Sequence, residues 1–143
     1  MLVHEFLEKS AQKFPDKTAL ICGGQRLTFL EIETEANRLA NAFRERGLGK
    51  QERIAIFLEP SVEAVVSVFG ALKAGGVFAV INPQVKAKKL SYILNDCQAK
   101  ILVTDASHLG EIAAALPDCH SLELVAVTDF DRVKKASLAA PDP

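Results

Sequence analysis

The fold is decided by the segment Leu72-Lys73-Ala74-Gly75-Gly76-Val77-Phe78-Ala79-Val80-Ile81-Asn82-Pro83. This segment ends an amphipathic helix, turns on two glycines and begins an apolar strand. Gly75 and Gly76 suit a helix exit, because glycine reaches positive φ without a steric penalty. Pro83 has no backbone N–H to donate to a neighbouring strand, so it ends the strand. The segment therefore predicts one helix-to-strand step of an α/β sheet.

The residues on either side repeat the same alternation. Residues 54 to 58 form an uninterrupted apolar run, which is typical of a strand covered on both faces. A helix follows them, and right-handed crossovers make successive strands parallel. We expect the strands of one mainly parallel sheet near residues 53 to 58, 77 to 81, 100 to 104 and 122 to 128.

Two further elements precede the sheet. Helical spacing of apolar residues predicts a first helix of about three turns that packs one face on the body. The residues on that face are Val3, Phe6, Leu7, Ala11 and Phe14. Gly23-Gly24 joins two short strand-like runs, which favours a β-hairpin. The predicted fold class is α/β, a mainly parallel sheet flanked by helices, with an N-terminal helix and a β-hairpin.

The second helix has a well-specified start. Thr28 can accept a hydrogen bond from the amide of Glu31, and the Glu31 carboxylate can reach back to the amide of Thr28. Leu27 and Ile32 occupy the positions of a hydrophobic staple around this cap. Glu31 is therefore interpreted as a capping residue and not as a catalytic acid or base.

Composition excludes several classes of function. The chain has 143 residues, of which 49% are hydrophobic, and 17 basic residues balance 18 acidic ones for a net charge of −1. This balance gives no overall electrostatic footprint for nucleic acid or an anionic membrane, and no apolar run is long enough for a membrane span. Cys22, Cys97 and Cys119 are odd in number and lack metal-ligand spacing. With no secretory leader at the start, the expected compartment is the cytoplasm.

Few residues suggest a catalytic, phosphate-binding or metal-binding site. The glycine pairs fail the spacing of phosphate-binding loops and are interpreted as turns. Cys119-His120, with His108 upstream, is a weak metal hypothesis, since no second cysteine lies at ligand spacing. Phe29, Phe57 and Phe69 fall on core-facing patterns. We assign no catalytic, cofactor-binding or metal-binding residue to this chain.

Two surface features have both a structural and a functional interpretation. Lys86, Lys88 and Lys89 crowd the first turn of a predicted helix, where they are either solvated or able to meet the phosphate end of CoA. Asn82-Pro83 follows the carboxyl end of a strand, the edge where open α/β sheets place ligands. It can line a substrate cleft, although ending the strand already explains Pro83.

Three of these segments together resemble the AMP-forming adenylating enzymes, a family of acyl-CoA synthetases, peptide-synthetase adenylation domains and luciferases. The segment from Leu72 to Pro83 resembles one signature of that family. Leu27-Thr28-Phe29-Leu30-Glu31-Ile32 resembles a second, with Phe for Tyr and Ile for the last Leu. Lys89-Leu90-Ser91-Tyr92-Ile93-Leu94-Asn95-Asp96 resembles a third, with Lys for Arg. The resemblance covers residues 2 to 129.

The resemblance implies a function for a longer parent protein. Such an enzyme uses ATP and Mg²⁺ to convert a carboxylic acid to an acyl-adenylate with release of pyrophosphate. It then passes the acyl group to CoA or to the phosphopantetheine of a carrier protein. The phosphate loop ending in Pro-Lys-Gly, and the later acidic and lysine motifs, do not occur before Pro143. We therefore expect this chain alone to be inactive.

The organisation expected from the sequence has two parts. Residues 1 to 129 resemble a subdomain of the large N-terminal domain of an adenylate-forming ligase, and residues 130 to 143 form a linker-like end, interpreted as a truncation point. A sheet without its usual covering would expose apolar surface, so self-association is expected. The alternative is a stand-alone, noncatalytic α/β module that binds a ligand or a protein.

Overall fold

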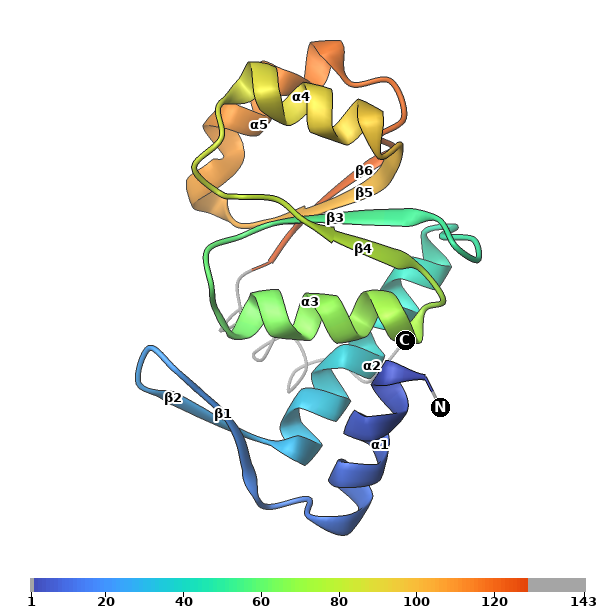
Figure 1. Ribbon diagram of the computed structural model, residues 1–143, viewed down its shortest axis with the longest axis vertical. Helices are drawn as coiled ribbons and strands as arrows, with labels where there is room; N and C mark the ends of the chain where they lie inside the picture. Colours follow the sequence, from blue (N-terminus) through green and yellow to red (C-terminus); the bar gives the residue numbers. More distant parts are fainter. Residues whose placement is uncertain (1, 129–143) are drawn as a thin grey trace.

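The computed structural model describes residues 2 to 128, so the linker-like end predicted for residues 130 to 143 lies outside the described part. The α-helices are α1 (Val3–Lys13), α2 (Phe29–Glu45), α3 (Val62–Lys73), α4 (Ala87–Asp96) and α5 (Leu109–Ala115). The strands are β1 (Thr18–Cys22), β2 (Gln25–Thr28), β3 (Arg53–Phe57), β4 (Val77–Val80), β5 (Ala99–Thr104) and β6 (Leu124–Val127). Helices α2 and α3 cover one face of a sheet, and α4 and α5 cover the other (Figure 1).

The main sheet is four-stranded and parallel, with the order β4-β3-β5-β6. This confirms the parallel sheet predicted from the sequence, with strand limits that differ by a few residues at most. Strands β1 and β2 pair antiparallel in a separate hairpin. Gly23 and Gly24 form its turn with φ of 56° and 80°, and two consecutive positive φ angles match the twist of hairpin strands.

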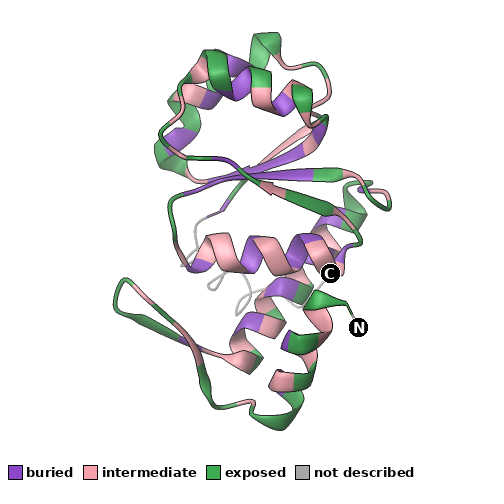
Figure 2. Cartoon of the chain, in the orientation of Figure 1, coloured by how far each residue is buried: buried purple, intermediate pink, exposed green. Residues whose placement is uncertain are grey.

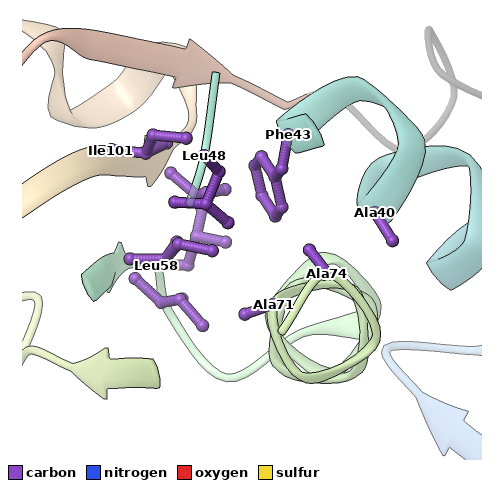
Figure 3. Packing of buried hydrophobic residues seen from close by; sticks show 10 residues of the cluster. Ala40, Phe43, Leu48, Leu58, Ala71, Ala74 and Ile101 are labelled. Atoms are coloured by element: carbon purple, nitrogen blue, oxygen red, sulfur yellow. The ribbon is translucent and has the colours of Figure 1, made fainter. Parts of the chain in front are cut away.

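Each strand of the sheet faces two cores, because successive side chains of a strand point to opposite faces. Ile54 and Ile56 of β3 pack toward α2 and α3, while Ala55 and Phe57 pack toward α4 and α5. Figure 3 shows the Phe43 ring of α2 directed toward the first of these cores, beside Ala71 of α3 and Ala74, the residue that follows α3. Strand β3 is buried on both faces (Figure 2), as its continuous apolar run predicts.

The step from α3 to β4 explains why two glycines stand in the segment from Leu72 to Pro83. The amide of Gly75 donates to the carbonyl of Leu72 (3.1 Å), and the amide of Gly76 donates to the carbonyl of Ala71 (2.9 Å). These two bonds form a Schellman cap, which needs a left-handed residue, and Gly75 supplies it with φ of 82°. The amide of Val77 then donates to the carbonyl of Glu52 (2.9 Å), so the strand begins in register with β3.

The capping box at the start of α2 is present. Thr28 Oγ1 accepts from the amide of Glu31 (3.1 Å), and Glu31 Oε1 accepts from the amide of Thr28 (3.0 Å). The staple residues Leu27 and Ile32 are both buried in the core that α2 shares with α1 and α3. Two amides that the helix itself leaves unpaired are thus satisfied before the helix begins.

The structure corrects the packing predicted for α1. Its length agrees with the prediction, but only Leu7 and Ala11 are buried. Val3, Phe6 and Phe14, which were predicted to face the core, are exposed. The reason is geometric: α1 packs on α2 and α3 along a stripe that is too narrow for the wider apolar set in the sequence.

The other aromatic predictions are confirmed. Phe57 is fully buried against α4 and α5. Phe29 and Phe69 are partly buried and pack against the core that α2 shares with α1 and α3.

Strand β4 lies at one edge of the sheet, and its apolar residues are exposed. The sequence led us to expect that the sheet exposes some apolar surface, and Val77, Phe78 and Val80 are exposed. Only β3 pairs with β4, so one side of its backbone has no strand partner among residues 2 to 128. Strands of this kind favour association with another strand.

We predict that Thr28→Ala lowers the free energy of unfolding by about 1 kcal/mol, since the amide of Glu31 loses its acceptor. Glu31→Gln should cost less, because the Gln carbonyl can still accept from the amide of Thr28. Urea denaturation of the purified variants measures both changes.

Thr34→Ala is a matched control on the same helix, where the hydroxyl only donates back to the carbonyl of Leu30. It should be close to neutral, because alanine favours a helix interior. A Thr28→Ala variant as stable as the parent, with an unfolded Glu31→Gln variant, would show that Glu31 has another role.

Candidate functional site

The carboxyl ends of β3 and β5 form the candidate site, because the chain reverses its direction across the sheet between them. From β3 the chain moves to β4 on one side, and from β4 it crosses back to β5 on the other side. Open α/β sheets place ligand crevices outside the carboxyl ends of strands at such a switch point. Here Glu59 follows β3, and Asp105 and His108 follow β5.

His108 joins the two strand ends. Its side chain is only 10% exposed. The Nδ1 atom lies 2.8 Å from Asp105 Oδ1, and Nε2 lies 3.7 Å from Glu59 Oε1. The ring packs on Phe57 with 4.9 Å between the centroids. Because an ionised carboxylate only accepts hydrogen bonds, Nδ1 carries the hydrogen in the bond to Asp105.

Asp105 is fixed by the turn that follows β5. Its Oδ1 accepts from the amide of Ser107 (3.0 Å) and from the Ser107 hydroxyl (2.5 Å), and so caps the 3-10 turn Ala106–His108. Partial burial opposes ionisation of Asp105, but the bonds from Ser107 and His108 outweigh it and lower the pKa of this carboxyl.

The end of β4 contributes a third polar contact. Asn82 Oδ1 accepts from the amide of Gln84 (2.9 Å), and Gln84 Nε2 donates to Glu59 Oε1 (3.3 Å). Asn82-Pro83 therefore lies at the same edge of the sheet as the other two strand ends. We call Glu59, Gln84, Asp105 and His108 the carboxyl-edge cluster.

The cluster can accept hydrogen bonds and hold a proton on the imidazole. Among residues 2 to 128, no group of three His, Cys, Asp or Glu residues is arranged to hold a metal ion. The weak metal hypothesis for Cys119, His120 and His108 therefore has no support in the described residues.

Cys119 Sγ donates to the carbonyl of Ala115 (3.3 Å), and burial, followed by the charge of Asp118, raises the pKa of its thiol. A raised pKa leaves less of the nucleophilic thiolate form at this position.

The three lysines at the start of α4 lie in two different environments. Lys86 Nζ lies 3.8 Å from Glu111 Oε1, and Glu111 Oε2 accepts from the amide of Ala87 (2.8 Å). A carboxylate from α5 thus caps α4 and offsets the unfavourable position of the cations. Lys88 and Lys89 are exposed on the first turn of the helix. Their structural interpretation as a solvated surface agrees with this exposure.

A second polar cluster lies between α1, α2 and α3. The ammonium of Lys73, with a side chain only 5% exposed, pairs with Glu8 (3.0 Å) and with Glu33. The three residues line a surface pocket of about 330 Å³ together with Ala11, Gln12, Leu30 and Asn37. A buried ammonium requires such partners, because desolvation of an unpaired charge is costly. Lys73 belongs to the segment from Leu72 to Pro83, and its ion pairs therefore connect this segment to α1 and α2.

The sequence contains a signal for part of the carboxyl-edge cluster. Glu59 and Asp105 each follow an apolar strand run, and parallel strands bring such residues to one edge. The pairing of His108 with both carboxylates depends on the order of the strands in the sheet, and no local sequence pattern indicates that order. The ion pairs of Lys73 join residues 65 and 40 positions apart, and no local pattern indicates them.

Comparison with known proteins agrees with this architecture. The sequence profile of the AMP-binding enzyme family matches residues 7–143. The chain belongs to this family. It is 36% identical over 137 residues to bacitracin synthase 1 of Bacillus licheniformis, a match that covers 94% of this chain and 3% of the synthase. It is 34% identical to gramicidin S synthase 1 of Brevibacillus brevis, over 71% of this chain and 9% of that protein.

Solved structures of ligases share the fold. The anthranilate CoA ligase AuaEII, crystallised with anthranoyl-AMP, superposes with a TM-score of 0.87 at 28% identity over 94% of this chain. A benzoate CoA ligase from Burkholderia xenovorans LB400 gives 0.83 at 26% identity over 95% of this chain. The chain corresponds to 27% and 28% of these two structures. The family member described here therefore spans only a part of the length of its relatives.

We predict that stability depends on the ionised form of Asp105. Its folded-state pKa is lowered, so the stabilisation is present above the unfolded pKa of about 4 and is lost as the pH falls through the folded value. The parent should lose free energy of unfolding below about pH 4, and Asp105→Asn should lose less in that window while being less stable at pH 7. Urea denaturation over a pH series measures this.

Asp96→Asn is the matched control, since Asp96 is exposed at the end of α4. It should retain the pH dependence of the parent. Superimposable pH profiles for Asp105→Asn and the parent would contradict a stabilising charge at this position.

Proposed function

We propose that this chain is the structural N-terminal part of a ligase that activates a carboxylic acid with ATP. The observation that carries the proposal is the match of residues 7–143 to the AMP-binding enzyme family, combined with a parallel sheet that superposes on solved CoA ligases. The parent would form an acyl-adenylate with release of pyrophosphate, and then a thioester.

Two kinds of thiol acceptor fit the relatives. Bacitracin and gramicidin S synthases support a carrier-protein phosphopantetheine, whereas the anthranilate and benzoate ligases support CoA. Both remain proposals for the parent. Exchange assays of the full-length protein with panels of amino, aryl and fatty acids would separate the substrate classes.

We propose that the catalytic groups lie outside the residues described here. Departure of pyrophosphate requires a phosphate cradle, a metal ion and positive charge near the transferring group. Within residues 2 to 128 no set of three metal ligands occurs, and the left-handed glycines at 23, 24, 47 and 75 form a hairpin turn and two helix exits. Our proposal assigns ATP and Mg²⁺ to the parent and no catalytic step to this chain. We propose the cytoplasm as its location.

We predict that the isolated chain gives only background carboxylate-dependent exchange between ATP and pyrophosphate. The reason is that the phosphate loop ending in Pro-Lys-Gly and the later lysine motif, which would stabilise the transferring charge, do not occur before Pro143. The assay uses a panel of fatty, aryl and amino acids, with an intact peptide-synthetase adenylation domain as the positive control. Robust exchange above the no-acid blank would overturn the proposed division of roles.

We further propose that the isolated chain self-associates through β4. Val80, an exposed apolar residue, lies on a strand whose outer edge has no partner among the described residues. Such edges recruit a further strand, and a lysine on the edge opposes this pairing. In the parent, the remaining part of the ligase would cover the edge.

Val80→Lys should therefore reduce both the sedimentation coefficient at high concentration and the fluorescence of a hydrophobic dye. Ile21→Lys is the matched control, because Val80 and Ile21 are both 61% exposed and Ile21 lies on the separate hairpin. A parent that stays monomeric and dye-silent at high concentration would favour the stand-alone module instead.

A further inference from the structure

Helix α1 has apolar residues on two sides, and the fold buries the less apolar side. At about 100° per residue, the buried residues Leu7 and Ala11 lie about 40° apart around the helix axis. Phe6 lies about 100° from Leu7, on the side away from Ala11. Val3 lies between Phe6 and Leu7, and Val3 and Phe6 are 62% and 63% exposed. No helix within residues 2 to 128, α1 included, is long and apolar enough to cross a membrane.

Burial of apolar area alone favours another rotation of α1 about its own axis. A turn of roughly 60° would bring Val3 and Phe6 inward in place of Ala11 and would keep the next residue, Leu7, against α2 and α3. A phenylalanine ring removes far more apolar area from water than an alanine methyl group does. The core that α1 shares with α2 and α3 has partly buried apolar residues at its margin, which a further ring can contact. These residues include Phe29, Leu39 and Phe69.

Close packing does not explain the observed rotation. Glu8 lies about 100° from Leu7, on the side opposite Phe6. On this side α1 borders the surface pocket of about 330 Å³ and not a filled core. Glu8 lines the pocket together with Glu33 of α2 and Lys73 of α3. The helix therefore turns its Glu8 side toward a polar pocket and leaves its Phe6 side in solvent.

The ion pairs of Lys73 account for this choice. The Lys73 side chain is only 5% exposed, and its ammonium lies 3.0 Å from Glu8 Oε1. Its other partner is Glu33, whose side chain is 13% exposed. Rotation of α1 toward Phe6 would carry Glu8 away and leave the buried ammonium with one carboxylate in place of two. A buried ion pair adds little net stability, but it penalises an arrangement that removes one of the partners.

We propose that the ion pairs of Lys73 act as a conformational selector that sets the rotation of α1 about its own axis. With the pairs in place, Glu8 faces Lys73 and Phe6 stays in solvent. Without them, α1 turns and buries Phe6. Buried polar groups have a comparable role in coiled coils, where they fix the register of the helices at a cost in stability. This inference is independent of the ligase function.

A double variant removes the selector without leaving a buried charge. Lys73→Met keeps the length and the apolar stem of the lysine, and Glu33→Gln removes the carboxylate that would lose its partner. Hydroxyl-radical footprinting, read by mass spectrometry, measures how accessible each side chain is. We expect the oxidation rate of Phe6 to fall about threefold, because a ring that is 63% exposed becomes mostly buried. Leu7 should stay protected, because it faces the core in both rotations.

Two single variants separate the ion pair from a general loss of charge. Glu8→Ala removes only the partner on α1, so the oxidation rate of Phe6 should fall by a smaller factor. Glu5→Gln is the matched control, because it removes the same charge from α1 at a carboxylate that accepts from the amide of Leu2 (3.3 Å). Its Phe6 should react like that of the parent. Ile21, which is 61% exposed on the separate hairpin, is the internal standard and should react equally in every variant.

Three results would overturn the proposal. The first is an unchanged oxidation rate of Phe6 in a double variant that circular dichroism shows to be folded. The second is faster oxidation of both Phe6 and Leu7, which would mean that the ion pairs hold α1 on the body without setting its rotation. The third is an equal fall at Phe6 in Glu5→Gln. If the double variant does not fold, Glu8→Ala decides, and a Phe6 rate equal to that of the parent would overturn the selector.

Discussion

The exit of α3 at Gly75 and Gly76 is the constraint on which the rest of the sheet depends. The Schellman bonds to Leu72 and Ala71 end the helix, and the next amide, Val77, already pairs with the carbonyl of Glu52. A side chain at Gly75 would be strained by its positive φ, and a Cβ at Gly76 would lie 3.2 Å from that same carbonyl. This single turn therefore fixes the direction of β4, its register with β3 and the face that α3 covers.

The doubly covered sheet explains both the core and the candidate site. Because the crossovers through α3 and α4 lie on opposite faces, β3 and β5 become neighbours at the switch point. The same arrangement buries both faces of β3 and brings Glu59, Asp105 and His108 together at its carboxyl end. Packing and polar geometry are thus two results of one topology, and the ligase relatives share this topology.

Local patterns predicted the elements that local physics controls. The capping box of Thr28 and Glu31, the glycine hairpin and the parallel strands needed only nearby residues and handedness rules. The prediction for α1 was wrong in detail, because Phe6 and Phe14 have helical apolar spacing but lie outside the narrow contact with α2 and α3. Spacing indicates that a face is apolar, whereas the width of the neighbouring elements decides how much of it is buried.

The sequence by itself determined the order of helices and strands, the parallel sheet and the resemblance to adenylating enzymes. These depend on periodicity, capping residues and glycine positions, all of which act over a few residues. Only the tertiary structure decided that His108 bridges Glu59 and Asp105, that Lys73 is buried between two glutamates, and that β4 is the strand whose apolar residues are exposed. The pairs of His108 with Glu59 and of Lys73 with its glutamates join residues far apart in the chain, so they depend on the strand order and on the packing of the helices.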